Sequence, residues 1–116
     1  MSETHSGDDT STVDAVAQIA QIAQIAGSMK QIDQRALVVQ GLQYVAAQSQ
    51  VSARAVNLNK VMGFLTTETR RNEMDDATRF AVGWVALCMV ARHKRSGRVN
   101  QAEHQLIAQM IVKCMV

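Results

Sequence analysis

The residues with the clearest potential for chemistry lie in one polar run, RHKRSGRVNQAE, from Arg92 to Glu103. An EF-hand calcium loop has glycine at its sixth position, an apolar residue at its eighth and glutamate at its twelfth. Gly97, Val99 and Glu103 hold those positions here. Calcium also needs oxygen ligands at the first and third positions, where Arg92 and Lys94 would repel the ion. The spacing therefore predicts a helix that ends at a glycine, followed by a capped helix start, and no calcium site.

The same run carries four cations that could neutralise phosphates, which makes a small helical DNA-binding regulator using the basic turn 92–98 the alternative function. These cations are Arg92, Lys94, Arg95 and Arg98. The net charge is only +2, the run has no aromatic residue for base stacking, and no recognised binding motif surrounds it. Cations also gather at the negative end of a helix without any ligand. Nucleic acid is therefore not the expected partner.

Catalytic and metal sites find little support in the remaining reactive residues. His5, His93 and His104 lie beside no nucleophile, paired carboxylates or glycine-rich phosphate loop, and they lack the spacing of a helical metal pair. Cys88 and Cys114 have apolar neighbours and no Cys-x-x-Cys spacing, which predicts reduced thiols in the core. We expect no enzyme, no cofactor and no metal.

Length and composition favour a single helical domain. The 116 residues include no proline and four aromatic residues, and Ala, Gln, Val, Ile, Leu and Met are abundant. The pattern predicts an all-α bundle of four or five helices over residues 13–116, preceded by a disordered acidic tail over residues 1–12. That tail has no positive charge, so it cannot begin a secretory signal, and the apolar stretch after it is too short to span a bilayer. We expect a cytoplasmic protein without a membrane partner.

The expected helices are separated by caps and polar turns. They cover about 13–26, 29–48, 53–67, 76–96 and 101–116, with the segment TTETRRNEMDD as a turn. The repeat AQIAQIAQIA, residues 17–26, has a period of three. Because residues three apart drift by about 60° around a helix, its isoleucines spread over about half of the helix circumference. Such a face suits a helix that is covered on more than one side.

Apolar spacing also predicts which side of each helix faces the core. The expected core residues are Ile32, Ala36, Val39, Leu42, Ala46, Leu58, Val61, Met62, Leu65, Leu106, Ile107, Met110, Ile111 and Cys114, with Val38 and Val45 at the margin of the core face. The run FAVGWVALCMVA, residues 80–91, is apolar on every side and should form the central helix, with Trp84 in the core.

Three helices carry a second apolar stripe that points away from this core. The stripe residues are Leu37, Gly41 and Tyr44; Val56 and Phe64; and Val112 and Met115, with Arg92, Lys94 and Arg95 as a polar rim. A domain this small can hide only part of such area, and exposed apolar patches mark association surfaces. The stripes therefore predict partner binding or self-association, for which a homodimer is the simplest arrangement.

Two segments resemble a known family. The runs KQIDQRALVVQGLQYVAAQ and DDATRFAVGWVALCMVARHKRSGRVN, together with the overall length, are similar to quorum-sensing antiactivators of the QslA type. The resemblance implies an all-helical homodimer that binds the ligand-binding domain of a LuxR-type transcription factor. It would cover the surface through which the receptor dimerises and so prevent DNA binding. No family motif carries individual interface residues across, and a structural or secretion-associated helical subunit stays open as a third reading.

Overall fold

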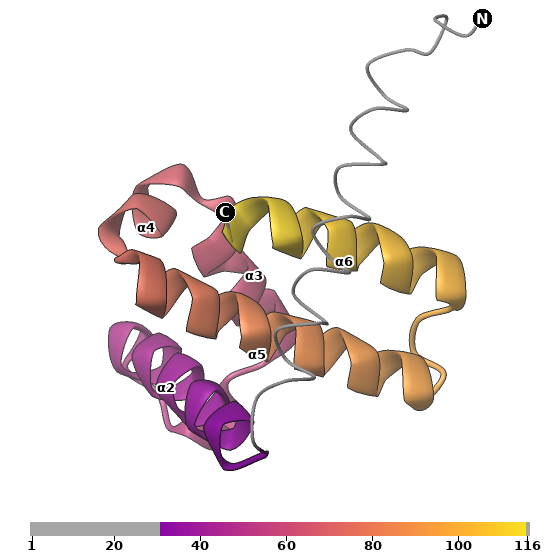
Figure 1. The fold of residues 1–116 in the computed structure, drawn as a ribbon, viewed down its shortest axis with the longest axis horizontal. Coiled ribbons are helices and arrows are strands. Elements are labelled where there is room, and N and C mark those ends of the chain that lie inside the picture. Colours follow the sequence, from indigo (N-terminus) through magenta and orange to yellow (C-terminus); the bar gives the residue numbers. More distant parts are fainter. Residues whose placement is uncertain (1–30, 116) are drawn as a thin grey trace, which may run out of the picture.

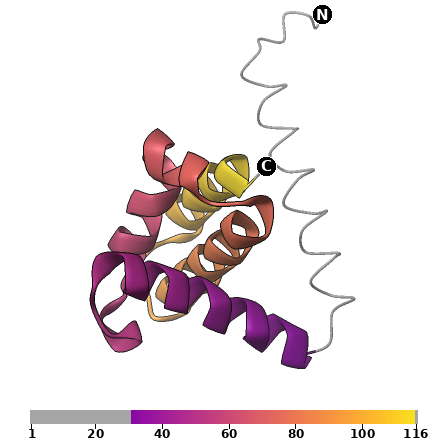
Figure 2. The same ribbon diagram turned by 90° about the vertical axis from the view of Figure 1, so that its left-hand side faces the viewer.

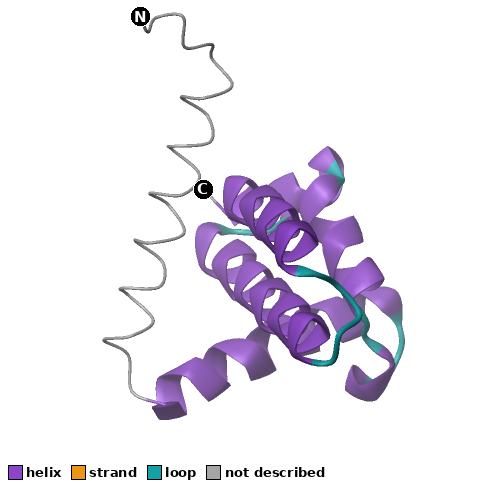
Figure 3. Cartoon of the chain, turned by 90° about the vertical axis from the view of Figure 1, so that its right-hand side faces the viewer, coloured by secondary structure: helices purple, strands orange, loops and turns teal. Residues whose placement is uncertain are grey.

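The elements in chain order are α2, Gln31–Ser49; the short 3₁₀ helix η1, Ala53–Ala55; α3, Leu58–Thr66; α4, Glu68–Glu73; α5, Asp76–Arg95; and α6, Gln101–Met115. The helix α5 lies at the centre of the fold, between α2 and α6, and α3 packs against it from a third side (Figure 1). Helix α2 crosses α5 obliquely (Figure 2). Short loops join the helices (Figure 3). The three flanking helices explain why the run 80–91 in α5 is apolar on every side.

The computed structural model describes residues 31–115. Within that range every regular element is a helix, which confirms the expected all-α class. The expected acidic tail, 1–12, and the expected first helix, 13–26, lie outside the described residues.

Residues of α5 that point to its three neighbours form the middle of the core. Ala81, Val82, Val85, Ala86 and Val90 are all at most 1% exposed. No polar or charged residue is buried anywhere between residues 33 and 115, so the described core is held by apolar packing alone. The predicted role of residues 80–91 as the central helix is confirmed.

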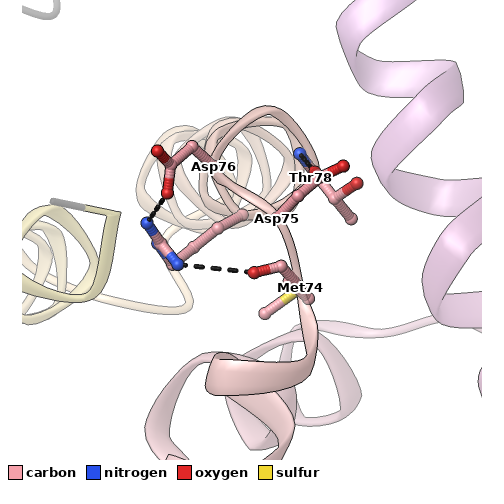
Figure 4. A network of polar contacts seen from close by, with 5 residues as sticks. Met74, Asp75, Asp76 and Thr78 are labelled. Atoms are coloured by element: carbon pink, nitrogen blue, oxygen red, sulfur yellow. Dashed lines mark hydrogen bonds and ion pairs between the residues drawn. The ribbon is translucent and has the colours of Figure 1, made fainter.

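A side-chain cap fixes the start of α5. Asp75 adopts extended backbone angles, and its Oδ1 accepts a hydrogen bond of 2.7 Å from the backbone N–H of Thr78 (Figure 4). Arg79, one turn into the helix, reaches back to Asp76 and to the carbonyl of Met74. This arrangement ties the loop before α5 to its first turn. Of the two caps that the sequence allows, Asp75 and Asp76, the structure selects Asp75.

The Asp75 cap makes the free energy of unfolding depend on pH. The hydrogen bonds from the backbone N–H and the hydroxyl of Thr78 lower the pKa of the Asp75 carboxyl, and the charge of Arg79 acts in the same direction. A lowered folded-state pKa means that the stabilisation is complete above about pH 4 and is lost as the pH falls through the folded pKa. In Asp75→Asn the amide keeps the acceptor but cannot titrate. Thermal unfolding followed between about pH 6 and pH 3 should therefore fall less steeply for Asp75→Asn than for the parent chain. Parallel curves would contradict this assignment.

The start of α6 is a reciprocal capping box. The backbone N–H of Glu103 donates to Asn100 Oδ1 at 2.8 Å, and the N–H of Asn100 donates to Glu103 Oε1 at 2.9 Å. The carboxylate that occupies the twelfth position of the EF-hand pattern therefore stabilises a helix start, as the spacing predicted.

Helix α2 is rotated relative to the predicted core face. Gly41 and Val45 are buried, whereas Ala36 is exposed and Val39 is 50% exposed. The physical reason lies in the close contact at Gly41, where an added Cβ would lie 2.6 Å from the carbonyl oxygen of Ala81. The expected core positions of Ala36 and Val39 are therefore wrong, because the contact point is a glycine that an apolar pattern does not register.

Helix α6 shows the same kind of error. Leu106 and Met110 were expected in the core, but they are 66% and 47% exposed, whereas Val112 and Met115 are buried. Gly83 of α5 leaves a hollow, and the Met115 side chain fills it so closely that an added Cβ at Gly83 would overlap it. A second glycine thus sets the rotation of the second flanking helix.

The segment before α3 is not one continuous helix from residue 53. Ser52 makes no capping bond, and the chain passes through η1 to Val56, which is extended and buried. Asn57 then caps α3 by accepting a hydrogen bond of 2.9 Å from the backbone N–H of Lys60. The burial of Val56 pulls the chain inward and moves the true helix start to Leu58.

The polar segment expected as a turn contains the short helix α4. Two of its arginines lie against α3: Arg70 stacks over the Phe64 ring at 4.5 Å, and Arg71 donates to the carbonyl of Leu65 at 2.8 Å. These contacts to α3 hold a segment that has no apolar face of its own.

Candidate protein-binding surface

Most of the predicted stripe residues lie inside the chain's own core. Val56, Phe64, Val112 and Met115 are between 0% and 8% exposed, and Gly41 is buried against α5. They cannot contact a partner in this conformation. The expectation that these stripes face outward is therefore wrong, because η1, α3 and α6 turn them towards α5 and towards one another.

Leu37 and Tyr44 are half-buried and form the accessible part of the predicted stripes. The Tyr44 ring meets the Phe64 ring edge-on, with centroids 6.0 Å apart. Burial raises the pKa of the Tyr44 hydroxyl, and the negative charge of Glu73 adds to this effect. Tyr44 thus belongs mainly to the contact between α2 and α3.

The exposed apolar side chains lie on residues outside the predicted stripes. Within the described range the large apolar side chains that are most exposed are Val39, Leu106 and Met110. Leu106 and Met110 are four residues apart and share one face of α6. Val39 lies on α2 and lines an apolar groove.

That groove lies between the first half of α2 and the middle of α5 and has a volume of about 380 Å³. We call it the α2–α5 groove; its lining residues are Gln34, Arg35, Val38, Val39, Trp84 and Cys88. Trp84 is half-buried here and is not enclosed in the core as expected. An indole and two valines make the floor apolar, while Arg35 adds hydrogen-bond donors.

Cys88 is exposed at this groove, so the expectation of a core thiol is wrong for Cys88, whereas Cys114 is half-buried. The atoms packed around the sulfur raise the pKa of the Cys88 thiol, although the charges of Arg92 and Arg95 act in the opposite direction. The thiol is therefore neutral at physiological pH and contributes apolar surface to the groove.

The basic turn follows directly after this part of α5. Arg92, Lys94 and Arg95 are exposed, and none of their side chains makes a hydrogen bond or ion pair with a residue between 31 and 115. Arg70, Arg71 and Arg79, by contrast, all hold neighbouring elements in place. The predicted polar rim is thus available for a ligand, with Arg92 and Arg95 close enough to act on the Cys88 thiol.

Comparison with known proteins identifies no relative. No protein-family model matches the chain, and no curated protein and no solved structure matches it. In the part of the chain that the structure describes, no helix is long and apolar enough to cross a membrane. No three His, Cys, Asp or Glu side chains gather there as a metal site would require.

The sequence contained one signal for the α2–α5 groove that the apolar pattern left unused. Val38 and Val39 are adjacent, and consecutive helical residues point about 100° apart, so at least one of them lies at the edge of the face that packs on a neighbour. Trp84 and Cys88 are four residues apart on α5 and therefore share a face. What the sequence could not reveal is that α2 crosses α5 so that these two pairs meet.

Proposed function

We propose that this chain is a non-enzymatic antiactivator that acts in the cytoplasm on a LuxR-type quorum-sensing transcription factor. It would bind the ligand-binding domain of the receptor, cover its dimerisation surface and so prevent DNA binding. The proposal draws on the resemblance of two long segments to antiactivators of the QslA type. The observation that carries it is the α2–α5 groove, where Val38, Val39 and Trp84 offer apolar surface beside Arg35.

The groove has the composition of a protein-binding hot spot. Tryptophan and arginine are enriched among the residues that dominate binding energies, and they lie here next to exposed apolar side chains. A stable interface takes about 800 Å² from each partner, which adjoining parts of α2 and α5 can supply. Blocking a dimer contact requires such a surface and no reactive group.

The exposed pair Leu106 and Met110 gives the proposal a second surface, which we assign to the homodimer. A two-fold axis brings the same patch of both copies together, so two residues on one helix face become a four-residue apolar contact. This assignment leaves the α2–α5 groove of each copy free for the receptor.

A charge inside the groove should abolish receptor binding. Val39→Asp introduces a carboxylate at a half-exposed position, where it does not disturb the core but must be desolvated in the complex. We expect the affinity for an isolated LuxR-type ligand-binding domain to fall by about tenfold or more, measured by titration calorimetry of the full chain. Receptor dimers should dissociate when the parent chain is added at equal concentration, as followed by light scattering.

Ala36→Asp is the matched control, because Ala36 is exposed on the same helix but does not line the groove. Its affinity should stay within about twofold of the parent value. Equal binding by the parent and Val39→Asp chains would reject this surface, and a receptor dimer that persists would reject the mechanism.

The second candidate is a DNA-binding regulator, favoured by the four cations of the turn 92–98 that have no ion-pair partner among residues 31–115. Phosphate contacts make affinity fall steeply with salt, whereas apolar occlusion responds far less. A salt titration of binding to duplex DNA and to the receptor domain distinguishes the two functions.

A further inference from the structure

A second groove lies on the side of α5 that faces the segment around Val56. Its volume is about 290 Å³, and its lining residues are Val56, Met89, Arg92, His93, Ser96 and Arg98. We call it the basic groove. It shares no lining residue with the α2–α5 groove, so it is a separate feature of the surface.

The end of α5 is built so that Arg98 returns to this groove. Gly97 has a φ of +82°, and the backbone N–H of Arg98 donates to the carbonyl of His93 at 2.9 Å. The N–H of Gly97 donates to the carbonyl of Lys94 at 3.1 Å. This is a Schellman ending, in which the chain folds back over the last turn. It places Arg98 beside Arg92 and His93, although the three are up to six positions apart.

Arg92 and Arg98 of the groove do not hold neighbouring elements in place as Arg70, Arg71 and Arg79 do. Neither Arg92 nor Arg98 makes a side-chain hydrogen bond or ion pair with a residue in the range 31–115. No acidic residue occurs between Asp76 and Glu103, and Glu103 already caps α6. Two guanidinium groups on one concavity repel each other, and an anion between them would relieve that repulsion.

The floor of the groove adds selectivity. Val56 is 8% exposed and Met89 is half-buried, so an anion bound here would have apolar atoms on one side. Charge-assisted hydrogen bonds are stronger next to apolar surface than in open water. A volume of about 290 Å³ exceeds the needs of a bare phosphate ion and approaches the lower end of ligand pockets.

We propose that the basic groove binds a small organic anion, in which a phosphate or carboxylate group is joined to an apolar body. Arg92 and Arg98 hold the charged group, His93 lies beside it, and Val56 and Met89 contact the apolar body. This site is independent of receptor binding through the α2–α5 groove. It also differs from a DNA surface, because only two of the four cations of the turn line it.

The test is an amide NMR titration of the full chain with phenyl phosphate, inorganic phosphate and benzyl alcohol. Phenyl phosphate should give saturable shifts of the backbone amides of His93, Ser96 and Arg98. It should bind about tenfold more tightly than inorganic phosphate, because only the ester buries an apolar body. Benzyl alcohol, which lacks the charge, should give no saturable shift. The indole N–H of Trp84, the single tryptophan, should stay in place because it reports on the α2–α5 groove.

Substitutions inside and outside the groove distinguish binding at this site from non-specific binding to a positively charged turn. Arg92→Gln and Arg98→Gln should each lower the affinity for phenyl phosphate by about tenfold or more, because each removes a charge-assisted hydrogen bond. Lys94→Gln and Arg95→Gln remove the same charge from the same turn but lie outside the groove, and they should change affinity by less than about twofold. All four residues are exposed, so helicity measured by circular dichroism should not change.

Three results would overturn the proposal. The first is the absence of any saturable shift with phenyl phosphate in the parent chain. The second is an equal loss of affinity in all four variants, which would make the turn a diffuse basic surface. The third is tight, steeply salt-dependent binding of a short DNA duplex that all four substitutions weaken, which would assign the turn to nucleic acid.

Discussion

Replacing Gly41 by alanine is expected to lower the free energy of unfolding by about 2 to 3 kcal/mol, a large part of the stability of a domain of this size. The new Cβ would lie 2.6 Å from both the carbonyl oxygen of Ala81 and a methyl group of Val85. Backbone atoms of α5 cannot rotate away as a side chain can, so α2 must move outward and lose contact with the core. Urea unfolding of the full chain, followed by circular dichroism, measures the effect.

Gly63→Ala is the matched control. Gly63 also lies within a helix, but an added Cβ there meets no atom within 4 Å. The lower chain entropy and better helix propensity of alanine should raise the free energy of unfolding by about 0.5 to 1 kcal/mol. A Gly41→Ala chain as stable as the Gly63→Ala chain would mean that Gly41 faces outward, where the apolar stripe of α2 had placed it.

Local signals in the sequence predict the element types and several boundaries. The caps at Asp75 and Asn100 and the glycine at position 97 act within one turn, so their effect does not depend on the rest of the fold. The run 80–91 predicts a central helix because no other position can cover an apolar surface on every side. The boundary near residue 57 was missed because Val56 is drawn into the core by tertiary packing.

The rotation of the flanking helices could not be predicted from apolar spacing. Gly41 and Gly83 carry no apolar side chain and so add nothing to a hydrophobic pattern, yet they determine where α2 and α6 approach α5. Each rotation exposed residues expected in the core, such as Val39 and Leu106, and buried residues expected at the surface, such as Val112. The predicted apolar stripes are therefore wrong for most of their residues, and the exposed apolar side chains are Val39, Leu106 and Met110.

The two grooves could be predicted from the sequence even less well than the helix rotations, because each groove forms between separate elements. Trp84 meets Val38 only through the crossing of α5 and α2, and Arg98 approaches Val56 only through the turn after α5. The residue types indicated apolar association, and the cations of the turn 92–98 indicated phosphate contacts only as the alternative function. The division of their lining residues between two grooves follows from the three-dimensional fold.

The rotation of α6 predicts that alanine substitutions on its buried face and on its exposed face differ strongly in their effect on the free energy of unfolding. Ile111 is 0% exposed, so Ile111→Ala removes three buried carbon atoms and leaves a cavity; the free energy of unfolding should fall by about 3 to 4 kcal/mol. Leu106 is 66% exposed, and Leu106→Ala should change the free energy of unfolding of a dilute monomer by less than about 0.5 kcal/mol. Apolar spacing alone had placed both residues in the core.

Repeating the unfolding at low and high protein concentration extends this comparison to the proposed homodimer. Association through α6 stabilises the folded state by mass action, so the parent chain should become more stable as its concentration rises. Leu106→Ala should lose that concentration dependence, because it removes part of the two-fold contact. Ile111→Ala should keep it, because its side chain never reaches the surface. If the free energy of unfolding of the parent chain does not depend on concentration, the proposed homodimer is wrong. If Leu106→Ala greatly lowers the free energy of unfolding at low concentration, Leu106 is part of the core.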